Sequence, residues 1–378
     1  MILNSLILQI AADVIGKSGR ENPADSVLRE ALAARRMPST EQKRDISRAV
    51  FNYYRWFGWL DAAHPLPGQI KHAIELAQAF KERPESFSDD KLVERVAPEW
   101  VRGQLEVSPA WARAIQAEPK LWLRARPGQG MALVEKLGAA KLEKTLLPDA
   151  VQYKGEEDLF RRPEFHAGEF EIQDIASQAV GWLAAPKPGE TWWDACAGEG
   201  GKTMHLSDLM QNKGLIWASD RAEWRLKNLK RRAARGKVFN FRSEAWDGGA
   251  KLPMKTKFDG ILVDAPCSGV GTWQRNPHAR WTTTLQDVTE LGAVQLQLLN
   301  HVAGSLKPGG KLIYSVCTLT QAETAAVVES FSAAHPELQP MVLPENICGG
   351  LPASAMKTIW PQDCGGNGMF IAGWRRAS

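Results

Sequence analysis

Short apolar runs alternate with longer amphipathic segments along the second half of the chain. Such runs are typical of buried strands, and the segments between them have the apolar periodicity of helices. The predicted strands are Thr191 to Ala195, Gly214 to Ser219, Lys237 to Phe241, Phe258 to Val263 and Lys311 to Val316, with a late edge strand from Gly368 to Trp374. The helices predicted between most of them are Lys202 to Gln211, Arg221 to Arg235 and Leu285 to Leu306. This order predicts an α/β fold with a doubly wound, Rossmann-like parallel sheet.

The first third of the chain shows apolar residues at helical spacing and no strand-like alternation before Leu121. The predicted helices are Ser5 to Ile15, Pro23 to Ala34 and Glu41 to Leu60. Ser39 or Thr40 is the expected cap of the third helix, because a hydroxyl there can accept from a free N–H of the first turn. We therefore expect an all-α domain over residues 1–115.

Residues 116–165 show weaker periodicity. The predicted elements are strands from Leu121 to Arg126 and from Ala150 to Tyr153, and a helix from Gln129 to Leu137. These elements predict a small α+β insert. The third domain is expected over residues 166–378: it begins with a helix from Ile175 to Leu183, and the breaker-rich stretch from Ala185 to Gly189 separates this helix from the parallel sheet.

Composition changes this picture little. The formal net charge of +4 is compatible with a nucleic-acid partner but is weak support by itself. The five cysteines are odd in number and form no Cys-x-x-Cys pair, so neither a disulfide framework nor a metal site is expected. No apolar run approaches the length of a membrane span, and we expect a soluble, cytoplasmic protein.

An acid and two thiols follow two of the predicted strands. Asp264 and Cys267 come directly after the strand that begins at Phe258, and Cys317 ends the strand that begins at Lys311. Because open α/β folds bind ligands at the carboxyl ends of their strands, these side chains are expected to meet at one edge of the sheet. A lone cysteine is more often a small buried hydrophobe. Two thiols with a carboxylate favour covalent chemistry.

The loop after the first strand, Trp193 to Thr203, is rich in small residues and opens a helix. Small residues let a ligand approach the backbone, and the helix N-terminus offers free N–H groups to an anion. The spacing matches neither G-x-G-x-x-G nor a P-loop. Acids follow the next three strands, at Asp220, Asp247 and Asp264. Each alone would be a cap or turn residue, but together they favour an adenosine cofactor with a carboxylate tail, such as S-adenosylmethionine.

Three segments carry a resemblance to a known family: Asp194 to Thr203, Asp264 to Thr272 and Tyr314 to Leu319. They resemble the RNA cytosine-carbon-5 methyltransferases of the NOL/NOP/Sun (Sun/Fmu) class, which have a class I S-adenosylmethionine-dependent methyltransferase domain. Glu171 to Ser177 is similar to a segment that precedes the catalytic domain in that family. Asp45 to Trp56 is similar to the NusB-like RNA-binding domain of its bacterial ribosomal RNA members.

The resemblance implies a role for each matching residue. Cys317 would be the nucleophile, Cys267 would assist product release, and Asp264 would contact the cytosine ring. The residues implied to bind S-adenosylmethionine are Cys196, Ala197, Gly198, Glu199, Gly200, Gly201, Lys202, Asp220, Arg225, Asp247 and Asp264, with Glu244 as the alternative to Asp247. The chain departs from the family pattern at Val316, where threonine is usual, at Gly198-Glu199, where Ala-Pro is usual, and at His278, where aspartate is common.

Three alternatives to a ribosomal RNA enzyme stay open. The altered loop at Gly198-Glu199 would fit a non-catalytic RNA-binding or assembly factor, although such a factor needs neither thiol. A DNA cytosine methyltransferase would attack with Cys267 and leave Cys317 without a role. Transfer RNA is the alternative RNA substrate. A monomer is expected, with RNA held by the basic segment Arg221 to Arg235 or, equally, with that segment as a solvated helix face.

Overall fold

The computed structural model describes residues 5–34, 39–142, 147–344 and 353–377. The chain divides into two compact units, each described here by itself. The first unit contains Met1–Pro119 and Gly269–Asp287, and the second contains Lys120–Ser268 and Val288–Ser378. The segment Gly269–Asp287 therefore belongs to the first unit although the sequence places it between two parts of the second.

The first unit is all-α, as predicted. Its helices are α1 (Ser5–Lys17), α2 (Ala24–Ala34), α3 (Thr40–Arg55), α4 (Leu66–Glu82), α5 (Asp89–Arg95), α6 (Pro109–Gln116) and the short α12 (Ala279–Thr282). Ser39 caps α3, because its hydroxyl accepts from the Gln42 N–H at 3.2 Å. The predicted third helix was too long, since α3 ends at Arg55. A 3-10 turn over Phe57–Trp59 follows, where a Cβ on Gly58 would lie 2.2 Å from the Arg95 carbonyl oxygen.

One buried guanidinium joins the segment Gly269–Asp287 to the rest of the first unit. Arg280 is fully buried and donates hydrogen bonds to the Arg55, Val96 and Ile115 carbonyls and to the Gln116 side-chain oxygen, at 2.7–3.2 Å. These acceptors lie at the C-terminal ends of α3, α5 and α6, where the helix dipole favours a cation. Burial and the neighbouring Arg55 nevertheless lower the pKa of Arg280 to about 9.

The second unit contains a small antiparallel sheet in the order β2-β3-β1-β4. Its elements are β1 (Leu121–Ala125), α7 (Gly130–Leu137), β2 (Ala140–Leu142), β3 (Ala150–Tyr153), α8 (Pro163–His166) and β4 (Phe170–Ile172). The strands β1 and β3 and the helix α7 lie where the sequence predicts them. β2 and β4 were not predicted, because three residues are too few to show an alternating pattern.

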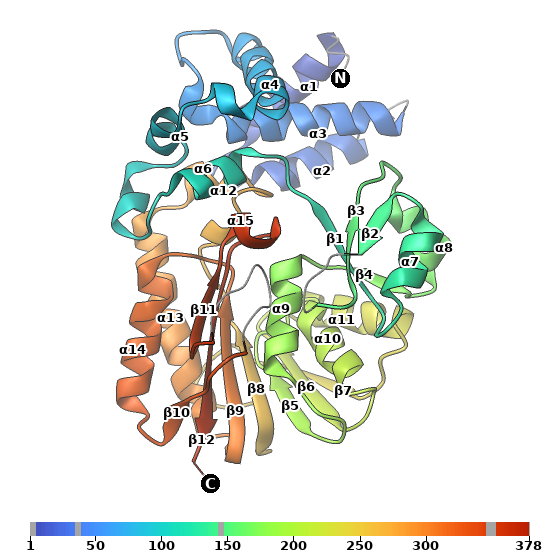
Figure 1. Ribbon diagram of the computed structural model, residues 1–378, viewed down its shortest axis with the longest axis vertical. Helices are drawn as coiled ribbons and strands as arrows, with labels where there is room; N and C mark the ends of the chain where they lie inside the picture. The colour runs from blue at the N-terminus through green and yellow to red at the C-terminus, as the bar shows by residue number, and fades with distance from the viewer. Residues whose placement is uncertain (1–4, 35–38, 143–146, 345–352, 378) are drawn as a thin grey trace. The chain divides into compact units, whose positions relative to one another are not determined.

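The larger sheet of this unit has the order β10-β12-β9-β8-β5-β6-β7, with β11 also paired to β12 (Figure 1). Its strands are β5 (Thr191–Asp194), β6 (Leu215–Asp220), β7 (Phe241–Ala245), β8 (Phe258–Asp264), β9 (Leu306–Val316), β10 (Leu338–Pro340), β11 (Met356–Ile359) and β12 (Met369–Arg376). The five neighbouring strands β9, β8, β5, β6 and β7 run parallel to one another, whereas β12 runs antiparallel to β9. The doubly wound, Rossmann-like prediction is therefore confirmed.

Helices cover both faces of this sheet (Figure 1). They are α9 (Ile175–Ala184), α10 (Gly201–Leu209), α11 (Glu223–Arg235), α13 (Leu285–Ala303) and α14 (Ala325–Ala334). The short α15 (Pro361–Cys364) follows the end of β11. One apolar core contains side chains of α13 and α14, and the opposite face is packed by α9 and α10. Among the described residues, no helix combines the length and apolarity that a bilayer crossing requires.

Two strand predictions were wrong. The third strand was expected over Lys237 to Phe241, but Lys237 adopts a φ of +53° and Val238 packs beneath α11, so β7 begins only at Phe241. β7 is an edge strand that is partly or fully exposed along its length, and its sequence shows no apolar alternation. The late strand β12 is not the edge of the sheet either, since β10 and β11 pair with its outer side.

Candidate active site

Two thiols meet at the carboxyl ends of β8 and β9. These strands are parallel neighbours in which Asp264 pairs with Ser315, so the segments that follow them start at the same edge of the sheet. The Sγ atoms of Cys267 and Cys317 lie 3.3 Å apart, and both residues are half-buried. The geometry therefore places both sulfur atoms within reach of a single substrate atom or its neighbour.

The Asp264 carboxylate faces a lysine from the neighbouring helix α10. The Lys202 ammonium donates to Asp264 Oδ2 at 2.7 Å, and the Ser315 hydroxyl donates to Asp264 Oδ1 at 2.7 Å. Burial alone would lower the pKa of Lys202. The charge of Asp264, the hydrogen bond to Asp264 and the nearby Cys317 outweigh this effect, so the pKa of Lys202 is raised above its ordinary value. Lys202 thus stays protonated beside both Asp264 and Cys317, where it can stabilise a thiolate.

A buried glutamate, Glu323, connects the segments that carry the two thiols. Its carboxylate accepts hydrogen bonds from Ser268, which follows Cys267, and from Thr318, which follows Cys317. The sequence did not single this residue out, because it lies six positions beyond the Thr-Cys-like motif. The signal that could have found it is an acid within an otherwise uncharged stretch that contains several hydroxyl side chains.

The loop between β5 and α10 leaves its backbone accessible. Gly198 and Gly200 have φ values of +55° and +84°, and a Cβ on Gly200 would lie 2.5 Å from Leu229 Cγ. No side chain caps the N-terminus of α10, and a Cβ on Gly198 or Gly201 would meet no atom within 4 Å. The first-turn N–H groups of α10 therefore remain available to an anionic group such as a carboxylate.

The remaining loop residues take distinct positions. Glu199 is exposed and accepts from the Asn228 amide at 3.1 Å, so its charge is turned toward α11 rather than into the loop. The Ala197 N–H donates to the Ser219 carbonyl at 2.8 Å, which fixes the loop on the end of β6. Burial, followed by the negative charge of Asp194, raises the pKa of Cys196 well above that of an ordinary thiol, so this third cysteine stays protonated.

The expected acids are not equally close to this loop. Asp220, buried at the end of β6, accepts from the Gly198 N–H at 3.0 Å, and Arg225 lies 3.8 Å from its carboxylate. Asp247 is exposed and accepts from the Gly249 N–H at 2.8 Å, the contact of a turn residue. Glu244, the alternative to Asp247, is exposed on β7. Of these expected acids, Asp220 and Asp264 contact residues of the cofactor loop and α10, whereas the contact described for Asp247 lies within its own turn.

A second acid, Asp194, is buried beneath the loop. It is fully buried, its Oδ2 accepts from the Thr203 hydroxyl at 2.6 Å, and its Oδ1 has no hydrogen-bond partner. Burial raises the pKa of Asp194 to about 7, with a further contribution from the charge of Asp264 and an opposing one from the Thr203 hydrogen bond. The sequence placed Asp194 inside a motif but assigned it no task.

Some basic residues of α11 are exposed, whereas others are already held in ion pairs. Arg232 and Arg235 form ion pairs of 2.9 and 2.6 Å with Glu171, whose side chain is buried, on β4. Five basic side chains of the predicted segment are exposed: Arg221, Arg225, Lys227, Lys230 and Arg231. The sequence-based expectation that the whole basic set faces RNA is therefore too broad, because two of its members hold the small sheet to the helix.

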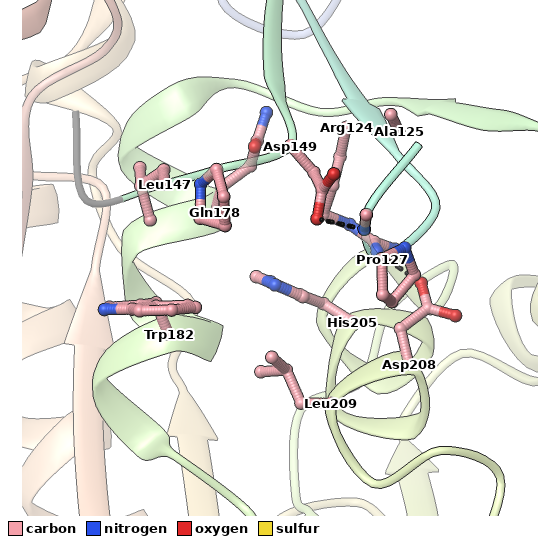
Figure 2. A pocket seen from close by; sticks show the side chains of 12 residues that line it. Arg124, Ala125, Pro127, Leu147, Asp149, Gln178, Trp182, His205, Asp208 and Leu209 are labelled. Carbon is pink, nitrogen blue, oxygen red and sulfur yellow. Dashed lines mark hydrogen bonds and ion pairs between the residues drawn. The ribbon is translucent and has the colours of Figure 1, made fainter. Parts of the chain in front are cut away.

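A cavity of about 250 Å³ lies between β1 and the helices α9 and α10 (Figure 2). Trp182 and Leu209 form part of an apolar wall, and the polar side chains that line the cavity are Arg124, Asp149, Gln178, His205 and Asp208. Arg124 already pairs with Asp208 and donates to the Gln173 side chain at 2.7 Å, while burial lowers the pKa of His205. The cavity contains neither thiol and is separate from the site at the end of β8 and β9.

Two further expectations concern cysteine and metal chemistry. Cys364 is disulfide-bonded, which the absence of Cys-x-x-Cys spacing did not anticipate, whereas Cys196, Cys267 and Cys317 form no disulfide. Over the described ranges, no group of three or more potential metal ligands comes together. His278, one of the departures from the family pattern, lies in the first unit, where it is buried with its ring 4.7 Å from that of Tyr54.

Comparison with known proteins gives this arrangement a context. Residues 181–375 match the family described as 16S rRNA methyltransferase RsmB/F. The chain belongs to this family. The match covers more than half of the chain, includes α10 and the strands of the larger sheet except the last residue of β12, and contains both thiols. The expected membership of the Sun/Fmu methyltransferases is thus confirmed.

Individual relatives agree with the family assignment. A probable ribosomal RNA small subunit methyltransferase B of Synechocystis is 33% identical over 76% of this chain and 66% of its own length. The chain spans between about half and two thirds of the length of the curated relatives first matched. A methyltransferase homolog of Pyrococcus horikoshii has a TM-score of 0.61 at 27% identity, covering 71% of this chain and 90% of that one. NSun6 of the same organism, solved with SFG, has a TM-score of 0.63 at 19% identity over 71% and 94% of the two chains, and shows the same fold.

Proposed function

We propose that this protein transfers a methyl group from S-adenosylmethionine to carbon 5 of a cytosine in ribosomal RNA. The observation that carries the proposal is the 3.3 Å separation of the Cys267 and Cys317 sulfur atoms beside the Lys202–Asp264 pair. Two thiols on one substrate face have separate uses in this chemistry, since one bonds to the base and the other assists its release. Membership of a ribosomal RNA methyltransferase family supports the substrate class.

The loop between β5 and α10 fits the cofactor. The uncapped N-terminus of α10 offers N–H groups to the methionine carboxylate, and the open space at Gly198 and Gly201 admits a ligand close to the backbone. Asp220, at the end of the second parallel strand, is placed to hold the ribose hydroxyls, with Arg225 beside it. Asp247 is the least supported member of the set. When bound, S-adenosylmethionine supplies an electrophilic methyl group on a positively charged sulfur.

The chain's own residues account for the activation of the base. Carbon 5 of cytosine is a weak nucleophile, and addition of the Cys317 thiolate to carbon 6 gives it enamine character. Lys202 stabilises the thiolate before the addition, and the Lys202–Asp264 pair can deliver a proton toward ring nitrogen 3 as negative charge develops there. After methylation, the carbon 5 proton passes to Cys267 or to water, and the electrons of that C–H bond re-form the ring double bond. The Cys317 sulfur leaves as a thiolate, and ring nitrogen 3 returns its proton to the Lys202–Asp264 pair. Cys267, at contact distance from that sulfur, assists the elimination.

RNA binding requires more than the thiols. A base in a stack cannot be reached by either sulfur, so the target cytosine has to be unstacked or flipped out. The exposed basic residues of α11 and the NusB-like helices of the first unit are the proposed RNA contacts, which would give affinity through phosphates. We further propose a monomer that acts in the cytoplasm.

Two other functions make different predictions. An RNA-binding assembly factor with a methyltransferase fold would bind no S-adenosylmethionine. The argument for it was the altered loop at Gly198-Glu199, and this argument is weaker because Glu199 points away from the cofactor loop. A DNA methyltransferase would use Cys267 as the nucleophile. Transfer RNA in place of ribosomal RNA remains the alternative substrate.

One experiment separates these possibilities. Purified protein is incubated with methyl-labelled S-adenosylmethionine and, in parallel, small-subunit ribosomal RNA, transfer RNA or duplex DNA, and the product nucleosides are analysed by mass spectrometry. The expected result is labelled 5-methylcytidine from ribosomal RNA. Label in DNA, or none with any nucleic acid despite folded protein, would overturn the proposal. Bisulfite sequencing of cellular RNA with and without the protein then locates the cytosine.

A further inference from the structure

The carboxylate of Glu323 is buried and surrounded by hydrogen-bond donors. Its residue is 0% exposed at the end of a 3-10 turn, Gln321–Glu323. The donors are the Ser268 N–H at 2.8 Å, the Ser268 hydroxyl at 2.5 Å, the Thr318 hydroxyl at 3.0 Å, the Thr320 hydroxyl at 2.7 Å and the Gln295 amide at 3.0 Å. Burial of a carboxylate is costly unless its oxygens accept hydrogen bonds, and these five donors satisfy both oxygens of Glu323.

These donors come from both thiol-bearing segments. Ser268 directly follows Cys267 and gives Glu323 two hydrogen bonds, while Thr318 directly follows Cys317. The Gln295 amide, on α13, also donates to the Pro266 carbonyl at 2.9 Å. The hydroxyls of Ser268 and Thr318 lie 3.0 Å from each other. A single carboxylate therefore ties the segment after β8 to the segment after β9 immediately beside the two sulfur atoms.

We propose that Glu323 is a positioning residue that holds Cys267 and Cys317 at their mutual distance for the release step. The inference rests on the proposed function, because it assigns Glu323 to the same two-thiol reaction. Neither thiol segment is part of a regular strand at this point, so strand pairing alone does not set the separation of the sulfur atoms. A misplacement of about 1 Å at a reacting atom can cost about 100-fold in rate.

The two oxygens of Glu323 differ in what they require. Oε1 accepts from the Ser268 N–H and the Gln295 amide, which can only donate. Oε2 accepts from the hydroxyls of Ser268, Thr318 and Thr320, which can rotate and accept instead. In Glu323→Gln, an amide nitrogen can therefore take the Oε2 position, and the network survives without its charge. In Glu323→Ala, the two obligate donors lose their acceptor.

The test uses full-length protein with ribosomal RNA and measures kcat, the KM for S-adenosylmethionine and the fraction of enzyme covalently bound to RNA. Glu323→Ala should lower kcat by about 100-fold, and Glu323→Gln by about 3- to 10-fold, the equivalent of one weakened hydrogen bond. The KM for S-adenosylmethionine should change by less than about twofold in both, since the cofactor loop follows other strands. Glu329→Gln, which removes an exposed negative charge from α14, is the matched control.

The covalent complex distinguishes positioning from a general loss of stability. If Glu323 positions Cys267 for release, a larger fraction of the Glu323→Ala protein should remain bonded to RNA than of the wild type. A variant that is merely less stable would lose active enzyme without enrichment of the complex, and this result would overturn the inference. Unchanged kcat in Glu323→Ala would do so as well.

A second variant covers the case in which Glu323→Ala does not fold. Ser268→Ala removes one hydroxyl donor beside Cys267 and leaves the carboxylate in place, so a fall in kcat of about 2- to 5-fold with more covalent complex is expected. Wild-type behaviour of Ser268→Ala together with Glu323→Gln would contradict the inference. If the wild type itself makes no 5-methylcytidine, the proposed function fails, whereas an active wild type with indifferent variants removes only the role of Glu323.

Discussion

Cys267 and Cys317, which are 50 positions apart in the chain, approach to 3.3 Å between their Sγ atoms. Their segments follow adjacent parallel strands, and the sequence indicates different neighbours for each: Asp264 and Pro266 precede Cys267, while Val316 precedes Cys317 directly. Two thiols at contact distance can divide one reaction between them. Which sulfur bonds to the base is then a question that exchange of each thiol can answer.

Substitution of the two cysteines should have opposite signatures. Cys317→Ala should lower methyl transfer by about a thousandfold or more, because no thiol then adds to carbon 6. Cys267→Ala should instead accumulate a protein–RNA complex that survives denaturation, since addition still occurs but release does not. Denaturing gel electrophoresis with labelled RNA measures both. Glu329→Gln, which changes an exposed residue of α14, is the control and should show neither effect. Trapping by Cys317→Ala would reverse the assigned roles.

Removal of the positive charge of Lys202 should slow the reaction and change its pH dependence. Lys202→Met removes the 2.7 Å partner of Asp264 and a positive charge beside Cys317, so we expect kcat to fall by about 100-fold at neutral pH. Part of this loss should return as pH rises, because a larger fraction of the thiol ionises in alkaline solution. Lys202→Arg retains the charge and is the comparison. A pH–rate profile identical in shape to that of the wild type would show that Lys202 does not act on the thiol.

Asp194 should make the stability of the second unit depend on pH. Its pKa is about 7 in the folded protein against 3.8 as the ordinary value, so the native state binds more protons between these pH values. Relative to its charged form, protonated Asp194 therefore favours the folded state. This contribution to the free energy of unfolding should be complete below about pH 4 and should be lost as pH rises through 7. Urea denaturation at several pH values should show the wild type losing stability relative to Asp194→Asn over this interval.

The control for this titration is Glu329→Gln, which removes a negative charge from an exposed position. Its stability relative to the wild type should stay nearly constant across the same interval. Parallel pH curves for the wild type and Asp194→Asn would contradict the raised pKa.

The exposed basic residues of α11 should contribute to RNA affinity through contacts with phosphates. Lys227→Gln with Arg231→Gln removes two exposed charges, so RNA affinity should fall and the slope of log affinity against log salt should decrease by about 1.4 to 1.8 in magnitude. Lys251→Gln with Lys255→Gln changes two exposed lysines elsewhere and should leave the slope unchanged. Filter binding over a range of salt concentrations measures both pairs. Equal slopes for the two pairs would exclude α11 as the phosphate-binding surface.

An internal ion pair offers the complementary measurement. Glu171→Ala leaves Arg232 and Arg235 without their buried partner and should cost about 3 to 5 kcal/mol of unfolding free energy. Chemical denaturation measures this cost. A loss below about 1 kcal/mol would mean that water satisfies the two guanidinium groups equally well.

The sequence predicted best those elements whose residues are buried on both sides. β8 contains a buried apolar stretch, residues 260–263, so the strand and the position of Asp264 at its end could be inferred directly. β7 was misplaced because an edge strand with exposed residues has no apolar pattern, and the nearby apolar residue Val238 packs under α11 instead. Secondary structure is visible in the sequence only where burial imposes a period.

The candidate site shows the same division. The nearness of Cys267 and Cys317 followed from two strand ends in a parallel sheet, and the small residues around Gly198 indicated an accessible loop. Glu323 and Asp194 were not assigned tasks, because their environment is made by residues distant in sequence, such as Ser268 for Glu323. A buried acid looks the same in a sequence as an exposed one. The roles of the matched residues themselves stay predictions until the substitutions above are measured.

The path of residues 269–287 has a practical consequence for dissection of this protein. A polypeptide that ends at Pro119 lacks Arg280, so the carbonyl ends of three helices lose the cation that satisfies them. A polypeptide that begins at Lys120 keeps Arg280 and Trp281 but has removed the helices that bury them. Truncation at the boundary between the units would therefore damage both of them. To produce the first unit alone, residues 269–287 have to be joined to its N-terminal helices. To produce the second unit alone, a short linker has to replace residues 269–287.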